Sequence, residues 1–112
     1  MDYRVAKMTD VIRETAAGVY LDSRESFYQD ARENKTVGKP LPTIVWIKRL
    51  PGFSKEGSLA ALEVCVDATK TVVTRNGKQL PEGEMFFGRF YFNRIDGRLK
   101  IANADIGKGP KC

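Results

Sequence analysis

The sequence predicts an α+β domain in which two N-terminal helices pack on a curved antiparallel sheet of four to five strands. Apolar residues recur every three or four positions near the start of the chain, whereas β-branched and aromatic residues dominate after residue 43. Two tight-turn dipeptides, Asn76-Gly77 and Asp96-Gly97, also punctuate the second half. The 112 residues suffice for one domain with its own apolar core, so we expect a single domain over 1–112.

An amphipathic helix is expected over residues 5–20, because its apolar positions share one face and charged side chains lie off that face. These positions are Val5, Met8, Val11, Ile12, Ala16, Val19 and Tyr20. A second helix is expected over 23–33, where Asp22 and Glu25 have the spacing of a capping box. Its inward positions would be Phe27, Tyr28 and Ala31.

Prolines 40 and 42 end the helical half of the chain, and three strands are expected after them. The first is "TIVWIKRL", residues 43–50, which is rich in β-branched and aromatic side chains. The second, within 58–68, alternates with a period of two. One of its faces would carry Leu62, Val64 and Val66, and the other Glu63, Cys65 and Asp67. The third covers 70–75, with a turn or a short strand after Asn76-Gly77.

The last two strands, 84–95 and 98–107, are predicted to form a hairpin around Asp96-Gly97. The first of them is apolar on both faces, so one face should meet a helix and the other should line a core or cavity. Met85, Phe87 and Tyr91 alternate there with Phe86, Phe90 and Phe92. Gly88 interrupts the run, where a glycine often marks a bulge or a sharp bend.

Charge and composition argue against several functions. The net charge is +5, but the basic residues are scattered, which favours a solvated surface over a nucleic-acid site. No run of about 18 apolar residues is present, and the start of the chain is not typical of a signal peptide. A membrane tether could therefore lie only outside these residues. The sequence has no histidine, and two cysteines cannot complete a zinc site, so no metal or other cofactor is expected.

The order of elements resembles the cone-shaped NTF2-like fold of SnoaL and ketosteroid isomerase. Three segments, "LEVCVDATKTVVTRNGK", "FGRFYFNRIDGRLKIANADIG" and "GKGPKC", look like a group of actinobacterial cell-envelope NTF2-like domains. That group carries a "CxD" strand, a "DGRWxV" hairpin and a final cysteine. Leu99 stands here where the group usually has tryptophan. The resemblance implies little chemistry, because the fold includes isomerases, dehydratases, cyclases and epoxide hydrolases beside members that only bind or assemble.

Cys65 and Cys112 are open to two interpretations. As free thiols in a cytoplasmic protein they need no relationship, whereas as a disulfide they would tie the end of the chain to the sheet. A bond closing this loop would stabilise the fold by roughly 3 to 4 kcal/mol on loop-entropy grounds and would persist only in an oxidising compartment. Without a histidine as thiolate partner, cysteine catalysis is not expected.

The candidate polar groups of an active site are Asp67 and Asp105, with Arg89 and Tyr91 as companions. NTF2-like isomerases use a buried carboxylate as base, but no spacing here ties these residues to that pattern, and surface carboxylates are the alternative interpretation. A small-molecule pocket could be walled by the aromatic set Trp46, Phe86, Phe87, Phe90, Tyr91 and Phe92, since such sites are mostly apolar, and an ordinary core is the alternative interpretation. Its candidate residues are Trp46, Phe87, Arg89 and Tyr91.

We therefore expect a non-enzymatic binding or assembly module of the bacterial cell envelope, with a protein partner or a small apolar ligand. A small lyase or isomerase of the polyketide cyclase or ketosteroid isomerase kind is the alternative, with Asp67 or Asp105 as base. A periplasmic-type component of a secretion or conjugation channel is a further alternative. A homodimer is compatible with the sequence, and a cytoplasmic location remains the alternative to the envelope.

Overall fold

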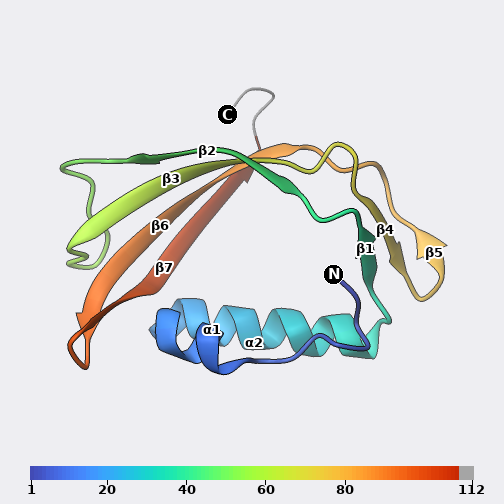
Figure 1. Cartoon of the computed structure of the whole chain (residues 1–112), viewed down its shortest axis with the longest axis horizontal. Coiled ribbons are helices and arrows are strands. Elements are labelled where there is room, and N and C mark those ends of the chain that lie inside the picture. Colours follow the sequence, from blue (N-terminus) through green and yellow to red (C-terminus); the bar gives the residue numbers. More distant parts are fainter. Residues whose placement is uncertain (109–112) are drawn as a thin grey trace.

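The computed structural model describes residues 1–108 and shows an α+β arrangement of two helices and two antiparallel sheets (Figure 1). The helices are α1 (Asp10–Thr15) and α2 (Gly18–Glu33). The strands are β1 (Val37–Lys39), β2 (Thr43–Arg49), β3 (Ala60–Asp67), β4 (Val72–Arg75), β5 (Lys78–Gln79), β6 (Met85–Ile95) and β7 (Arg98–Lys108).

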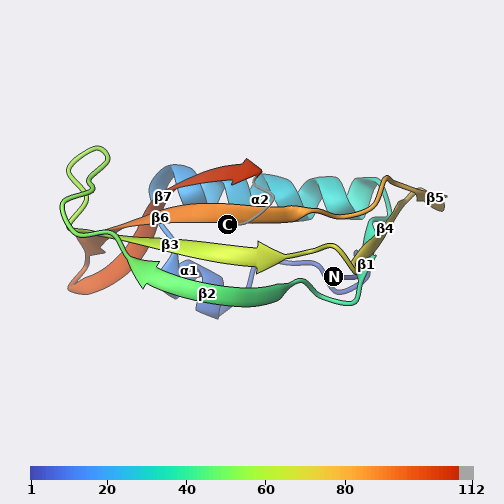
Figure 2. The same cartoon turned by 90° about the horizontal axis from the view of Figure 1, so that it is seen from above.

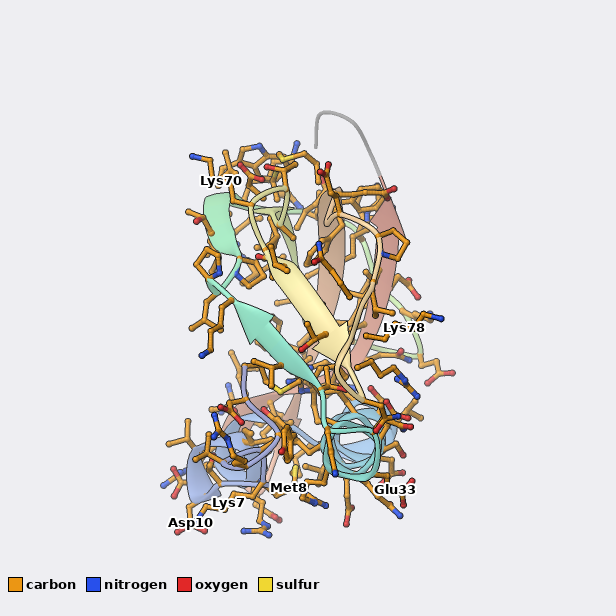
Figure 3. The ribbon with its side chains drawn as sticks, turned by 90° about the vertical axis from the view of Figure 1, so that its right-hand side faces the viewer. Lys7, Met8, Asp10, Glu33, Lys70 and Lys78 are labelled. Atoms are coloured by element: carbon orange, nitrogen blue, oxygen red, sulfur yellow. The ribbon has the colours of Figure 1, made fainter. Side chains whose placement is uncertain are left out.

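The larger sheet has the strand order β2-β3-β6-β7 and arches over the two helices. Seen from above, α2 runs beneath the β6 and β7 side and α1 beneath the β2 and β3 side (Figure 2). The smaller sheet, β1-β4-β5, joins the two layers at one end of the molecule. Figure 3 shows this end, with Lys70 high beside the larger sheet and Glu33 low on the helical layer. The larger sheet is open, with β2 and β7 as its edges.

The predicted helix boundaries are wrong, because the chain leaves helical geometry at Ala16 and Ala17. Ala16 forms a parallel bridge with Ile101 of β7, and the Ala17 N–H donates to the Ile101 carbonyl at 2.9 Å. Both alanines are buried against that strand. A backbone contact with β7 thus divides the predicted 5–20 helix.

The second predicted helix begins earlier than expected, since α2 already starts at Gly18. Asp22 is therefore inside α2, and the capping box that it was expected to form with Glu25 is wrong. Ala31 is buried as predicted, but Phe27 is exposed. Residues 5–9 precede α1 outside any helix.

The strands and turns of the second half are confirmed. The segments predicted as strands form β2, β3, β4 and the β6–β7 hairpin, and Leu62, Val64 and Val66 share one face of β3 as expected. In both predicted turns the two central residues have positive φ, as a type I′ turn requires: 53° and 77° at Asn76-Gly77, and 53° and 79° at Asp96-Gly97. The sequence pattern did not predict β1 or a separate smaller sheet.

The irregularity expected at Gly88 occurs elsewhere. The β3–β6 and β6–β7 pairings run through Gly88 without a shift, whereas the register changes between Tyr91 and Phe92 and leaves Ala102 of β7 unpaired. Gly88 instead makes room for an aromatic ring, since a Cβ there would lie 2.7 Å from Cε2 of Phe90.

The apolar interior is small. The buried apolar residues of the described chain are Ala6, Ala16, Ala17, Ala31, Ala61, Cys65, Ala68 and Tyr91. The accessible surface of 7635 Å² exceeds the roughly 6200 Å² expected for a compact chain of 12.6 kDa. The radius of gyration, 15.0 Å, likewise exceeds the roughly 13 Å expected for this length. The chain therefore covers less of its surface than a compact protein of this size does.

Candidate functional site

An apolar hollow of about 330 Å³ lies between the larger sheet and α2. Its walls are Tyr20, Ile44, Leu62, Val64, Val66, Phe86, Gly88, Phe90, Phe92 and Ile101. The volume is within the range of roughly 300 to 1,000 Å³ that is typical of small-molecule sites. The lining carries no charged side chain, and the Tyr20 phenol is its one polar side-chain group.

The two-residue period of the strands places these side chains together. Leu62, Val64 and Val66 alternate on β3, and Phe86, Gly88 and Phe90 do the same on the neighbouring β6. Gly88 pairs with Val64 in the middle of this face, so the missing side chain leaves space there. We call this face, which is turned toward the helices, the inner face of the sheet.

An edge-to-face contact between Tyr20 of α2 and Phe90 of β6 separates this hollow from a second one. The two ring centroids lie 6.1 Å apart with an interplanar angle of 89°. The second hollow, of about 310 Å³, shares Tyr20, Phe86 and Phe90 with the first and adds Arg24 from α2. The two hollows therefore adjoin each other, and the lining of the second includes a cationic residue.

A third hollow, of about 440 Å³, lies where the chain enters β6. Its lining includes Glu82, Glu84 and Phe86. It therefore adjoins the inner face through Phe86 and adds acidic residues at that end.

The rim of the inner face is open to solvent. Ile44 and Ile47 of the edge strand β2 are 58% and 56% exposed, and Ile106 of β7 is 62% exposed. Exposed apolar side chains gathered beside an apolar hollow are typical of a surface that binds something. The inner face is therefore the candidate functional site.

The four residues predicted to wall a pocket lie on the opposite, outer face. Trp46 pairs with Cys65 and Cys65 with Phe87, while Arg89 and Tyr91 follow at two-residue intervals on β6. The structure brings these four side chains onto one face but does not place them in the three hollows described above.

Cation–π contacts link the outer face to the loop between β2 and β3. The guanidinium carbon of Arg89 lies 5.3 Å from the ring centroid of Phe53, and the Lys55 ammonium lies 5.9 Å from the ring centroid of Tyr91. Phe53 and Lys55 both belong to this loop, so the loop folds over part of the outer face.

Glu63 is the centre of an ion-pair network on the outer face. Its carboxylate accepts a hydrogen bond from Arg89 Nε at 2.8 Å and lies 3.6 Å from Lys48 Nζ. The hydrogen bond from Arg89, with the charges of Arg89 and Lys48, holds the pKa of Glu63 below its usual value. The Glu63 side chain is only 13% exposed, so the network shields its charge on this face.

Asp105 and Asp67, the predicted candidate bases, lie in separate hydrogen-bonded groups. The Lys55 ammonium donates to Asp105 at 2.6 Å, and this bond lowers the pKa of Asp105. Asp67, at the end of β3, accepts hydrogen bonds from the Thr69 N–H at 2.9 Å and the Thr69 hydroxyl at 2.6 Å, which lower its pKa. Neither carboxylate lines one of the three hollows.

Cys65 lies on the outer face with only 1% of its surface exposed. The predicted disulfide to Cys112 lies outside the described residues, because they end at residue 108. Among the described residues no group of three histidine, cysteine, aspartate or glutamate side chains is arranged to hold a metal ion. Neither helix in residues 1–108 is long and apolar enough to cross a membrane.

Three residues that line the hollow, Phe86, Phe90 and Phe92, belong to the aromatic set predicted to wall a pocket, whereas the aliphatic residues of β3 were predicted only as one face of a strand. The period-two pattern of Leu62, Val64 and Val66 was the available signal. Arg24 carried no signal, since its position depends on how α2 crosses the sheet.

No protein-family model, curated protein or solved structure matches this chain, so the resemblance to NTF2-like domains stays a proposal.

Proposed function

We propose that this protein is a non-enzymatic binding module with an NTF2-like fold, and that it holds an apolar small molecule against the inner face of its sheet. The observation that carries the proposal is the hollow of about 330 Å³, whose side chains are apolar apart from the Tyr20 phenol. Such walls offer an apolar ligand a place to leave water, at roughly 25 cal/mol for each Å² of apolar surface buried. They offer a reacting group neither a base nor an anion-stabilising donor beyond that phenol.

The surface of the molecule supports the same proposal. The chain exposes well over 1,000 Å² more than a compact protein of its mass, and Ile44, Ile47 and Ile106 lie at the rim of the inner face. A ligand seated there would cover apolar surface that the chain leaves in water.

The lyase or isomerase alternative has less support. A general base in this kind of enzyme lies against its substrate, and burial tunes its pKa upward toward neutrality. Asp67 and Asp105 lie outside the three hollows, and hydrogen bonds from Thr69 and Lys55 shift their pKa values downward instead. Binding therefore fits the arrangement of these side chains better than catalysis does.

A location in the cell envelope is part of the proposal and rests on the cysteine pair and the resemblance. A disulfide between Cys65 and Cys112 would require an oxidising compartment. Intact-mass analysis of non-reduced protein from its native compartment should find a mass two hydrogens below that of the dithiol. Two free thiols would contradict this part of the proposal and leave the binding function standing.

Binding is tested with the neutral fluorescent probe Nile red. We expect its emission to rise and shift to the blue on addition of the protein, and the signal to fall when dodecanol competes. Val64→Phe should weaken binding at least about tenfold, because a phenyl ring would fill the space opposite Gly88. Val72→Phe, which adds the same ring to the smaller sheet, is the matched control and should bind normally.

Light scattering on the same samples tests the competing occupant, a second copy of the chain. A wild-type dimer that Val64→Phe converts to monomers, with no probe binding by either protein, would mean that the inner face is a subunit interface. That result would overturn the proposed function.

A further inference from the structure

Arg24 is the one charged residue in the lining of these two adjoining hollows. It comes from α2, one turn beyond Tyr20, and is half-buried. The second hollow, which it lines, shares Tyr20, Phe86 and Phe90 with the apolar hollow. A ligand that fills the first hollow and passes the Tyr20–Phe90 contact would therefore enter the second hollow, which Arg24 lines.

The Arg24 guanidinium is oriented by aromatic side chains of its own helix. Its central carbon lies 4.8 Å from the ring centroid of Phe27 and 5.0 Å from that of Tyr28, and one nitrogen donates to the Tyr28 hydroxyl at 3.1 Å. These contacts hold the planar group in place without neutralising its charge. The ion pairs within residues 1–108 do not include Arg24, so none of the described carboxylates lies within 4.0 Å of it.

A guanidinium has five N–H donors in a rigid fork, and the contact with Tyr28 occupies one of them. The fork matches a carboxylate, whose two oxygens can accept two parallel hydrogen bonds. An apolar hollow beside a second one that Arg24 lines is complementary to a single-chain amphiphile with an anionic head.

We propose that the ligand is a long-chain carboxylate, a fatty acid, with its acyl chain in the apolar hollow and its head group on Arg24. This inference rests on the proposed function and adds the ligand class to it. The volume of about 330 Å³ favours one acyl chain over the paired chains of a phospholipid.

The test compares dodecanoate with dodecanol, both below their aggregation limits, as competitors of Nile red at pH 8. The wild-type protein should bind dodecanoate at least about tenfold more tightly, as expected for a charge-assisted hydrogen bond to a half-buried guanidinium. In Arg24→Gln this preference should fall to near one. Arg13→Gln removes the same charge from α1, away from the hollows, and should keep the wild-type preference.

The outcomes separate this inference from the function on which it rests. Equal affinity for dodecanoate and dodecanol in the wild type would overturn the fatty-acid inference and leave an apolar binding module. Failure to bind dodecanoate, dodecanol and Nile red would overturn both. Tight binding to phosphatidylglycerol vesicles with no response to dodecanoate would replace the fatty acid by a membrane surface and so contradict the inference.

A second variant keeps the test decisive if Arg24→Gln does not fold. Arg24→Lys retains the positive charge but loses the planar fork. It should keep only part of the preference for dodecanoate, and thermal unfolding followed by circular dichroism would show that it is folded. A full wild-type preference in folded Arg24→Lys would mean that charge alone selects the ligand, which contradicts recognition of the carboxylate by the guanidinium fork.

Discussion

The two faces of the four-stranded sheet differ in how far contacts within the chain pair and cover their side chains. On the outer face, Glu63 is paired with Arg89 and Lys48, and Tyr91 is 5% exposed beneath the loop that carries Lys55. On the inner face, side chains of the same strands border a hollow, and the edge residues Ile44 and Ile47 are more than half exposed.

This difference separates stability from binding within one sheet. The outer face is closed by contacts within the chain, so its residues should contribute mainly to the free energy of unfolding. The inner face is apolar but only partly covered, so its residues should contribute less to stability and more to holding a ligand. Matched substitutions on the two faces test this division.

Truncation of one large aromatic residue on each face should give the largest contrast in stability. Tyr91→Ala should lower the free energy of unfolding by about 3–5 kcal/mol, because it empties a buried site in β6. Phe92→Ala, one residue further along on the inner face, should cost only about 1–2 kcal/mol, since its ring already borders open space. Urea unfolding at neutral pH measures both values.

Equal losses for Tyr91→Ala and Phe92→Ala would mean that both faces are equally packed. The division would also be contradicted if Phe92→Ala and a folded Tyr91→Ala protein lost Nile red binding to the same extent.

Two glycines offer a smaller and more closely matched comparison. At Gly107 an added Cβ would lie 2.5 Å from Cζ of Phe87 on the outer face, and at Gly88 it would lie 2.7 Å from Cε2 of Phe90 on the inner face. Gly107→Ala should cost about 1–3 kcal/mol, because the Phe87 ring is held on the closed face. Gly88→Ala should cost less, because Phe90 can move into the hollow, but it should weaken probe binding.

Calorimetric unfolding and probe titration of both alanine variants check this prediction. A larger loss of stability in Gly88→Ala, or weaker binding in Gly107→Ala than in Gly88→Ala, would reverse the assignment of the faces.

The strands could be predicted because their signals are local. Alternation in Leu62, Val64 and Val66 and the turn residues Asn76-Gly77 determine strand type and hairpin position within a few residues of the chain. The helix boundary at Ala16 could not be predicted in this way. It depends on a backbone hydrogen bond between Ala17 and Ile101, which are far apart in the sequence. The three-residue strand β1 has too short a pattern to be recognised at all.

The candidate site was only partly predictable for a related reason. Periodicity shows which residues of β6 share a face, but both faces of this strand are apolar, so periodicity does not show which face borders the hollow. Trp46, Arg89 and Tyr91 combine aromatic and polar groups, as a binding site does, but they lie on the outer face. Their polar groups instead engage ion pairs and the loop before β3.

The acid dependence of stability should show the smallest effect and should arise from the outer face. The hydrogen bond from Arg89 lowers the pKa of Glu63 below its ordinary value of 4.5, so the folded state favours the ionised form. This contribution is fully present above pH 4.5 and is lost as the pH falls through the lower pKa of the folded protein, where the carboxylate is protonated. Glu63→Gln should therefore flatten the fall in unfolding free energy below pH 4.5, as measured by urea titrations at successive pH values.

Glu14→Gln alters a surface pair, in which the Glu14 side chain is 61% exposed, and should leave the curve unchanged. Hydrogen bonds from Lys55 and Thr69 also lower the pKa values of Asp105 and Asp67, so part of the slope should persist in Glu63→Gln. An acid limb identical to that of the wild type would show that the Glu63 network does not help to hold the outer face closed.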